Sequence, residues 1–161
     1  GKLDAGVSDL RTAADAAERC GTRVTLLRAR IELGRALAAR DAAEEARTLL
    51  SGVLEEVGSL RLGSLEPEAR LALAESLEVA GESAAAFESA RNAASQAESI
   101  GDRDTAILAH ALAGRTAEQD DAREEHGAAA RRLADALASE FGEESASYLN
   151  RPDLQASLPR S

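Results

Sequence analysis

The chain of 161 residues has very few aromatic side chains, which limits the kinds of core and binding site it can build. Phe87, Phe141 and Tyr148 are its only aromatic residues, and it has no tryptophan and no methionine. Alternating β-branched stretches of strand length are also missing. Its apolar content of 44% comes mainly from Ala and Leu, which are good helix formers. The sequence therefore predicts an all-α protein.

Cysteine and long apolar runs are scarce as well. Cys20 is the only cysteine, which excludes an internal disulfide framework and is typical of a reducing compartment. No apolar run reaches the roughly 18 residues of a membrane span, and residues 1–10 show no signal peptide. We expect a cytoplasmic protein without a membrane span. The start at Gly1-Lys2 indicates a fragment boundary, with a further region upstream.

The formal net charge of −10 indicates which partners the chain is suited to. Phosphate binding requires clustered basic groups, whereas the 19 Lys and Arg residues are dispersed along the chain. Nucleic acid is therefore not an expected partner. The simplest interpretation of the charges is a solvated acidic surface with ion pairs between residues four apart on helices. The near-total use of Arg over Lys suggests a GC-rich, bacterial coding sequence.

No group of residues has the spacing of a catalytic or metal site. His110 and His126 stand on different predicted helices, and no His-x-x-x-His pair exists. Phosphate-binding glycine motifs and nucleophile motifs are missing too. Adjacent carboxylates such as Glu44 and Glu45 point about 100° apart on a helix and are poor acid–base pairs. We expect no catalytic residue, no metal and no cofactor, and we predict that the protein is not an enzyme.

A pattern with a period of forty residues organises the chain. Its first unit has Leu33-Gly34, Leu37, a break at Asp41, and then Ala46, Leu50 and Val53. The same register gives Leu73-Ala74, Leu77, Gly81, Ala86, Ala90 and Ala93, and then Ala113-Gly114, Ala117, Asp121, His126, Ala130 and Leu133. Self-similarity at a fixed period of about 20–50 residues indicates stacked helical hairpins. Small residues at Gly34, Ala46, Ala74, Ala86 and Gly114 are expected where paired helices approach closely.

Helical periodicity and breakers predict seven helices. They cover residues 3–19, 22–39, 41–57, 66–80, 83–99, 104–118 and 122–140. Asp41 and Asp121 have the spacing of capping boxes with Glu44 and Glu124. Pro67 is expected in the first turn of its helix. Residues 143–149 are expected to lay Tyr148 and Leu149 over the last helix pair, and residues 154–161 to be extended or disordered.

These positions resemble the tetratricopeptide repeat (TPR) family, in a subclass with a forty-residue period. Its small eighth position corresponds to Gly34, Ala74 and Gly114, its small twentieth position to Ala46, Ala86 and His126, and its twenty-seventh to Val53, Ala93 and Leu133. The family's aromatic positions and closing proline are missing, and its usual period is about 34 residues. The placement of His126 at a small buried position favours a packing substitution over a ligand.

The resemblance implies a right-handed α-solenoid of antiparallel helix pairs, with about three and a half repeats and a C-terminal capping helix. It would be a single domain over residues 1–161. Residues 1–20 would be a half repeat or cap, 21–60, 61–100 and 101–140 the repeats, and 141–161 the C-terminal cap and tail.

In the family, the first helices of the pairs line a concave groove. The corresponding positions here are Arg28, Ile31, Glu32 and Arg35, then Glu68, Leu71, Ala72, Glu75 and Glu78, and then Leu108, Ala111, Leu112 and Arg115. An apolar middle with charged edges suits an amphipathic helix or an extended peptide. Pairing of Arg28, Glu32 and Arg35 along one helix is the alternative.

The sequence thus predicts a non-enzymatic scaffold or adaptor that binds a protein segment, whose identity and oligomeric state stay open. The alternatives are a sensory or regulatory TPR module of a larger bacterial signalling protein, and a self-associating structural domain.

Overall fold

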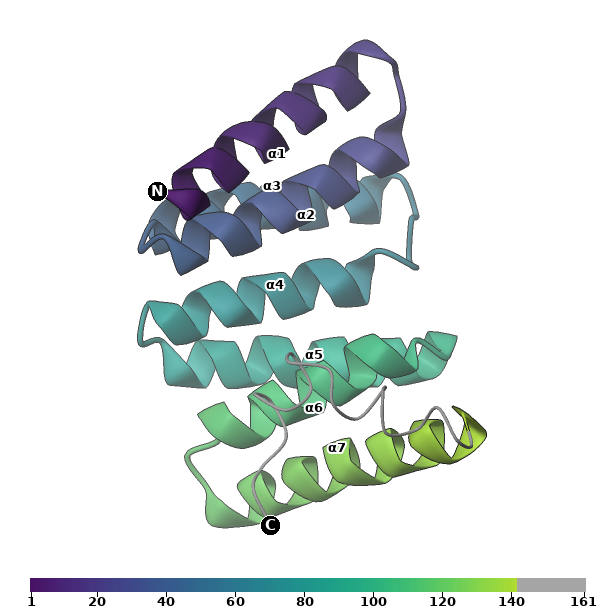
Figure 1. The fold of residues 1–161 in the computed structure, drawn as a ribbon. Coiled ribbons are helices and arrows are strands. Elements are labelled where there is room, and N and C mark those ends of the chain that lie inside the picture. The colour runs from purple at the N-terminus through teal and green to yellow at the C-terminus, as the bar shows by residue number, and fades with distance from the viewer. Residues whose placement is uncertain (142–161) are drawn as a thin grey trace.

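The computed structural model describes residues 1–141, which form seven α-helices and no β-strand (Figure 1). The helices are α1 (Lys2–Arg19), α2 (Arg23–Ala39), α3 (Ala43–Ser59), α4 (Glu66–Val79), α5 (Ser83–Ile100), α6 (Arg103–Thr116) and α7 (Asp120–Phe141). The predicted all-α class is confirmed, and every predicted helix end agrees to within two residues. The predicted cover by Tyr148 and Leu149, and the predicted tail, lie outside the described residues.

The first five helices, α1 to α5, end at a regular interval of twenty residues. The residues with positive φ are Gly21 (69°), Asp41 (61°), Arg61 (54°), Gly81 (77°) and Gly101 (75°). In each case the next residue donates its backbone N–H to the carbonyl five residues earlier, as Thr22 does to Ala17 at 3.0 Å and Glu82 to Leu77 at 2.9 Å. This is the Schellman arrangement, which satisfies free carbonyls at a helix end. The forty-residue period is therefore two helix-plus-turn units of equal length.

The two predicted capping boxes are wrong. The N-cap of α3 is Ala42, and no side chain caps that helix end. Asp41 instead occupies the left-handed position that ends α2, so its carboxylate is one residue too early to cap α3. Asp121 lies inside α7, which begins at Asp120. An Asp three residues before a Glu forms a capping box only when that Asp is the N-cap residue. Neither Asp41 nor Asp121 is the N-cap of its helix here, because the preceding turns start α3 and α7 at other residues.

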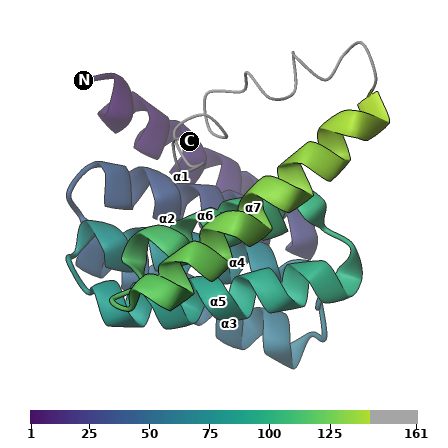
Figure 2. The same ribbon diagram turned by 90° about the horizontal axis from the view of Figure 1, so that it is seen from below.

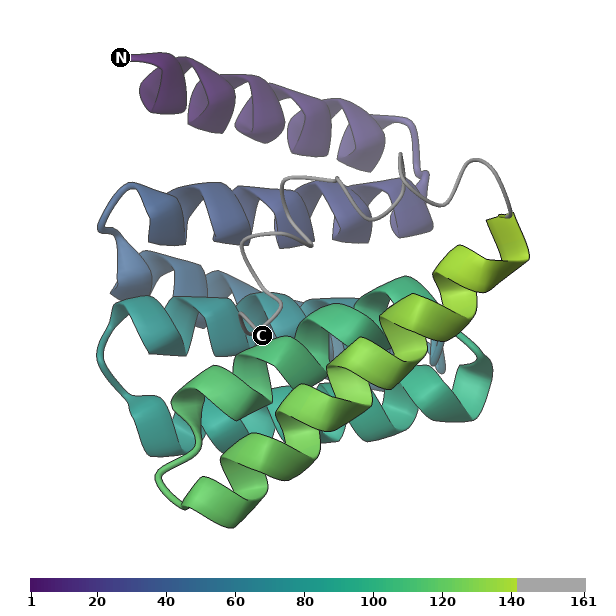
Figure 3. The same ribbon diagram turned by 60° about the horizontal axis from the view of Figure 1, so that its bottom comes forward.

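The helices stack in chain order, and α2, α4 and α6 form a central layer. Each helix packs on the next, and in addition α2 packs on α4 and α4 on α6. Helices α3 and α5 both lie on one side of this layer (Figures 1 and 2). Helix α1 closes one end of the stack, and α7 crosses the other end obliquely (Figure 3). Successive antiparallel helices of this kind are consistent with a helical repeat.

The predicted close contacts between paired helices are present. Ala46, Leu50 and Val53 of α3 are at most 1% exposed and form the stripe that meets α2. At Gly34, an added Cβ would lie 2.6 Å from Cγ of Leu50. At Gly114, it would lie 3.3 Å from the backbone nitrogen of Gly127 in α7. Small residues at these positions let the helices approach more closely than larger side chains would permit.

Candidate functional site

The apolar middle of the predicted groove is not on the surface. Ile31, Leu71 and Leu112 are 0%, 2% and 1% exposed, so they cannot contact a partner, and this part of the groove prediction is corrected. Leu108 is partly buried against the clusters around Leu112 and Ile107. Partner binding by the remaining predicted residues stays a prediction.

The burial follows from the number of neighbours that each central helix has. Helix α2 packs on α1, α3 and α4, and α4 packs on α2, α3, α5 and α6. A helix with neighbours on several sides buries more than one stripe of its surface. Ile31 accordingly belongs to a cluster with Leu27 of its own helix and with Leu50 of α3. The groove prediction requires one packed face and one free face on each of these helices.

The charged residues of the predicted groove do come together. We call Arg28, Glu32, Arg35, Glu68, Glu75, Glu78 and Arg115, which lie on α2, α4 and α6, the charged face. Nε of Arg35 donates to Oε2 of Glu75 across a 3.0 Å contact, and Nη1 of Arg35 donates to Glu32 at 2.5 Å. Arg35 also lies 3.8 Å from the carboxylate of Glu68. These contacts join the first two repeats.

The same charged positions recur with alternating sign. Arg35, Glu75 and Arg115 are spaced forty residues apart, so the order along the stack is positive, negative, positive. Nε and Nη2 of Arg115 donate to the two carboxylate oxygens of Glu78 at 3.2 and 3.3 Å. Each arginine thereby reaches a glutamate on α4. We call this row of Arg35, Glu75 and Arg115 the ladder; it spans α2, α4 and α6.

Partial burial affects the charges at the centre of the ladder. Burial raises the pKa of the Glu75 carboxyl, and the attraction of Arg35 offsets this only in part. Burial alone would lower the pKa of Arg35. The attraction of Glu75 and Glu32 outweighs the effect of burial, and the pKa of Arg35 is therefore raised. Ion pairs in such partly desolvated places depend on both partners, because either one left alone is costly.

Arg28 differs from the other arginines of the charged face. Its side chain is exposed, and within residues 1–141 it makes no ion pair or hydrogen bond. The alternative in which Arg28, Glu32 and Arg35 pair along one helix therefore holds only for Glu32 and Arg35, which are three residues apart. Arg28 is the cation of this face that an incoming group can meet without breaking an internal pair.

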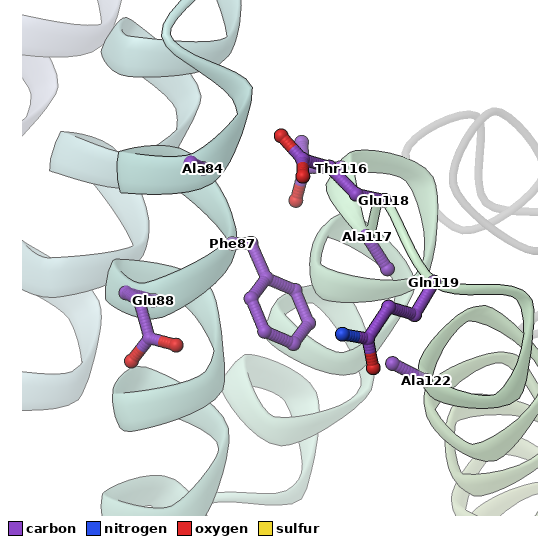
Figure 4. A pocket seen from close by; sticks show the side chains of 8 residues that line it. All are labelled: Ala84, Phe87, Glu88, Thr116, Ala117, Glu118, Gln119 and Ala122. Atoms are coloured by element: carbon purple, nitrogen blue, oxygen red, sulfur yellow. The ribbon is translucent and has the colours of Figure 1, made fainter.

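Two hollows in the surface are poorer candidates for a site. A pocket of about 230 Å³ lies where Phe87 of α5 points toward Gln119 of the α6–α7 connection and Ala122 of α7 (Figure 4). Small-molecule sites usually enclose about 300–1,000 Å³, so this pocket is too small for a typical ligand. A wider hollow beside Leu33 and Leu49 is rimmed by Glu44 and Glu45. Those carboxylates already pair with arginines of the protein.

A contact that the sequence analysis missed joins the two histidines. His110 on α6 and His126 on α7 place their Nδ1 atoms 2.8 Å apart, and both residues are 9% exposed. Phe87 meets the His126 ring edge to face, with ring centroids 5.6 Å apart. The two histidines are sixteen positions apart, with a helix end and a turn between them, so helix periodicity gave no signal for the pair. The burial of His126 agrees with the predicted packing substitution.

The described residues were also considered as metal ligands and as membrane spans. Among residues 1–141, no group of three or more His, Cys, Asp or Glu residues is arranged to hold a metal ion. None of the helices in the same region has the length and apolar character to cross a membrane.

No protein-family model matches the chain, and a search of curated proteins finds no match.

Proposed function

We propose that this protein is a non-enzymatic protein-interaction scaffold, and that it binds a protein segment across the charged face of α2, α4 and α6. We infer a TPR-like right-handed solenoid as its architecture, on the strength of the repeat register. The observation that supports the binding role is the in-register ladder of Arg35, Glu75 and Arg115. Such a ladder offers charges of both signs at the spacing of stacked helices, which is about 8–10 Å between axes.

The chemistry of the face favours a polar segment over an amphipathic one. The apolar residues beneath the ladder are buried, so a partner would gain little from apolar contacts there. A segment carrying both acidic and basic groups can instead pair with the exposed ends of the face. Arg28 would meet an acidic group directly and Glu68 a basic one, whereas Arg115 and Glu78 would exchange their mutual pair for groups of the partner. Complementary charges of this kind set specificity and association rate more than affinity.

The experiment compares three proteins as baits in cell lysate, read by quantitative mass spectrometry. The test bait carries Arg28→Glu and Arg115→Gln on the charged face. The control bait carries Arg91→Glu, because Arg91 is an exposed arginine on α5, on the other side of the central layer. Arg35 is left intact because its internal pairs support the fold. All three baits are first matched by thermal melting.

The proposal expects at least one protein that the parent and the Arg91→Glu bait retain and that the charged-face bait loses. That protein would then be titrated as a purified partner, with an increase in Kd of at least about tenfold for the charged-face variant, or about 1.4 kcal/mol. Equal retention by all three baits would argue against this face. If no bait retains any protein, a regulatory module that acts on an attached domain becomes the better explanation.

A further inference from the structure

The histidine pair lies at a tight helix contact. His126 precedes Gly127, whose backbone lies against Gly114 of α6, and His110 is one turn before Gly114. An added Cβ at Gly114 would be 3.4 Å from the carbonyl oxygen of Arg123, so the backbones of the two helices already approach closely. The amino-terminal half of α7 thus meets α6 most closely beside the histidine pair.

The 2.8 Å contact between the two Nδ1 atoms requires a specific count of protons. A hydrogen bond needs one nitrogen with a hydrogen and one without. With both rings neutral, or with one ring charged, one Nδ1 can donate and the other accept. With both rings protonated, each Nδ1 carries a hydrogen and no acceptor remains. Two cations would then face each other in a buried place, where the repulsion is stronger than in water.

Charged groups on α5 and α7 lie around the histidine pair. Nε2 of His110 lies 3.4 Å from Oε1 of Glu98 on α5. Burial lowers the pKa of His126, as do His110 and Arg91, while Glu125 and Glu98 act in the opposite direction. Helix α4 also packs on α6, but its charged groups are paired elsewhere: Glu66 with Arg70, Glu68 and Glu75 with Arg35, and Glu78 with Arg115.

The carboxyl-terminal half of α7 has a separate anchor. Ile107 of α6 and Ala134 of α7 form a buried cluster, against which Leu133 and Leu137 pack. Arg103 pairs with Glu140 near the end of the helix. None of these contacts involves a histidine, so the anchor of the carboxyl-terminal half differs in kind from the histidine pair.

We propose that the His110–His126 pair is a pH-sensitive latch, which holds the amino-terminal half of α7 on α6 and releases it when both imidazoles are protonated. The direction of the pH dependence of stability follows from the number of protons that the folded and unfolded states bind. Because the pKa of His126 is lowered from its ordinary value of 6.5, the unfolded state binds more protons than the folded state as the pH falls below that value. Stability from this contact is therefore complete above about pH 6.5 and is lost as the pH falls through the lowered pKa.

The test measures amide hydrogen exchange of residues 120–130 at about pH 7.5 and about pH 5, corrected for the intrinsic pH dependence of exchange. Histidine is the side chain whose ordinary pKa lies in this range. The key variant is His126→Ala, which restores the residue found at the matching positions Ala46 and Ala86 of the other repeats. Both of those alanines are fully buried, so the variant is expected to fold.

The latch predicts that exchange of residues 120–130 in the parent accelerates at least about tenfold at the lower pH, which corresponds to about 1.4 kcal/mol in the free energy of opening. Residues 131–141 and helices α1–α3 would change little. In His126→Ala the corrected exchange would be the same at both pH values. Burial raises the pKa of Glu75, and Glu75 is unchanged in this variant, so a pH response that came from Glu75 would persist in His126→Ala.

A spectroscopic measurement keeps the proposal testable if the variant folds poorly. Imidazole ¹⁵N spectra of the parent at about pH 7.5 should show one of the two rings with its proton on Nδ1, the less common tautomer, because the pair requires one Nδ1 donor. Two rings protonated on Nε2 would overturn the proposal. So would equal corrected exchange of the parent at both pH values, or a pH response that persists in His126→Ala.

Discussion

The contact of Gly34 with Leu50 permits a stability prediction with a matched control. Replacing Gly34 with Ala places a Cβ 2.6, 2.7 and 2.8 Å from Cγ, Cδ2 and Cδ1 of Leu50. Carbon atoms pack best at about 3.5–4.0 Å, so the new atom is about 1 Å too close to three carbons. Leu50 is 0% exposed, and its branch point must move as well as its methyl groups. The packing of Leu50 against Gly34 therefore favours a residue without a side chain.

Two opposing terms determine the size of the effect. Overpacking a well-packed contact costs about 1–3 kcal/mol. Replacing Gly with Ala inside a helix contributes about 1 kcal/mol of stability through helix propensity. We therefore expect Gly34→Ala to change the free energy of unfolding by about 0 to 2 kcal/mol in the destabilising direction.

Gly52 supplies the control. It lies inside α3 and is exposed, and an added Cβ there meets nothing within 4 Å. Gly52→Ala therefore has only the propensity gain and should stabilise by about 0.5–1 kcal/mol. The two variants should differ by about 1–3 kcal/mol, which corresponds to roughly 2–12 °C in Tm for a chain of this size. Urea denaturation followed by far-ultraviolet circular dichroism measures both values.

A double-mutant cycle identifies the cause. Leu50→Ala removes the three carbons that clash, so Gly34→Ala in that background should become stabilising, by about the propensity gain. The close contact between α2 and α3 would be refuted if Gly34→Ala had the same effect in both backgrounds. It would also be refuted if Gly34→Ala stabilised the protein as much as Gly52→Ala does.

Two further predictions concern the turns and the ion pairs. Gly81 has a φ of 77°, so Gly81→Ala should lower the free energy of unfolding by about 1–2 kcal/mol. Arg61 has a φ of 54°, so Arg61→Gly should stabilise the protein or be neutral. Equal denaturation midpoints for the two variants would argue against the twenty-residue turn pattern. Hydrogen bonds from Arg70 and Gln96 lower the pKa of Glu66, so its contribution is present above about pH 4.5 and is lost as the pH falls through the lowered pKa. Glu66→Gln should accordingly flatten the pH dependence of the free energy of unfolding in that acidic range, measured by denaturant titration, and an unchanged slope would contradict this.

The helices and their ends could be predicted from the sequence because the signals are local. A glycine such as Gly21 or Gly101 can adopt a positive φ without steric cost, and its place after an apolar stripe marks the end of that helix. The stripe of Ala46, Leu50 and Val53 needs only the 3.6-residue period to indicate a buried face. The left-handed conformation of Arg61 was not predicted, because arginine carries no such signal.

The candidate site was predicted only in part. The ladder of Arg35, Glu75 and Arg115 follows from the forty-residue register, so the sequence could indicate that these side chains share a face. It could not indicate that Ile31 and Leu71 beneath them are buried, because burial depends on how many helices surround each one. The capping role predicted for Asp41 was also wrong, since the turn before α3 placed it one position too early.

The sequence by itself therefore determined the all-α class, the seven helices and the register in which they repeat, because backbone preferences and side-chain periodicity act over a few residues. The tertiary structure decided which faces remain free and which distant side chains meet. Contact between His110 and His126 exists only because α7 folds back across α6 at Gly114, and that approach depends on the packing of whole helices.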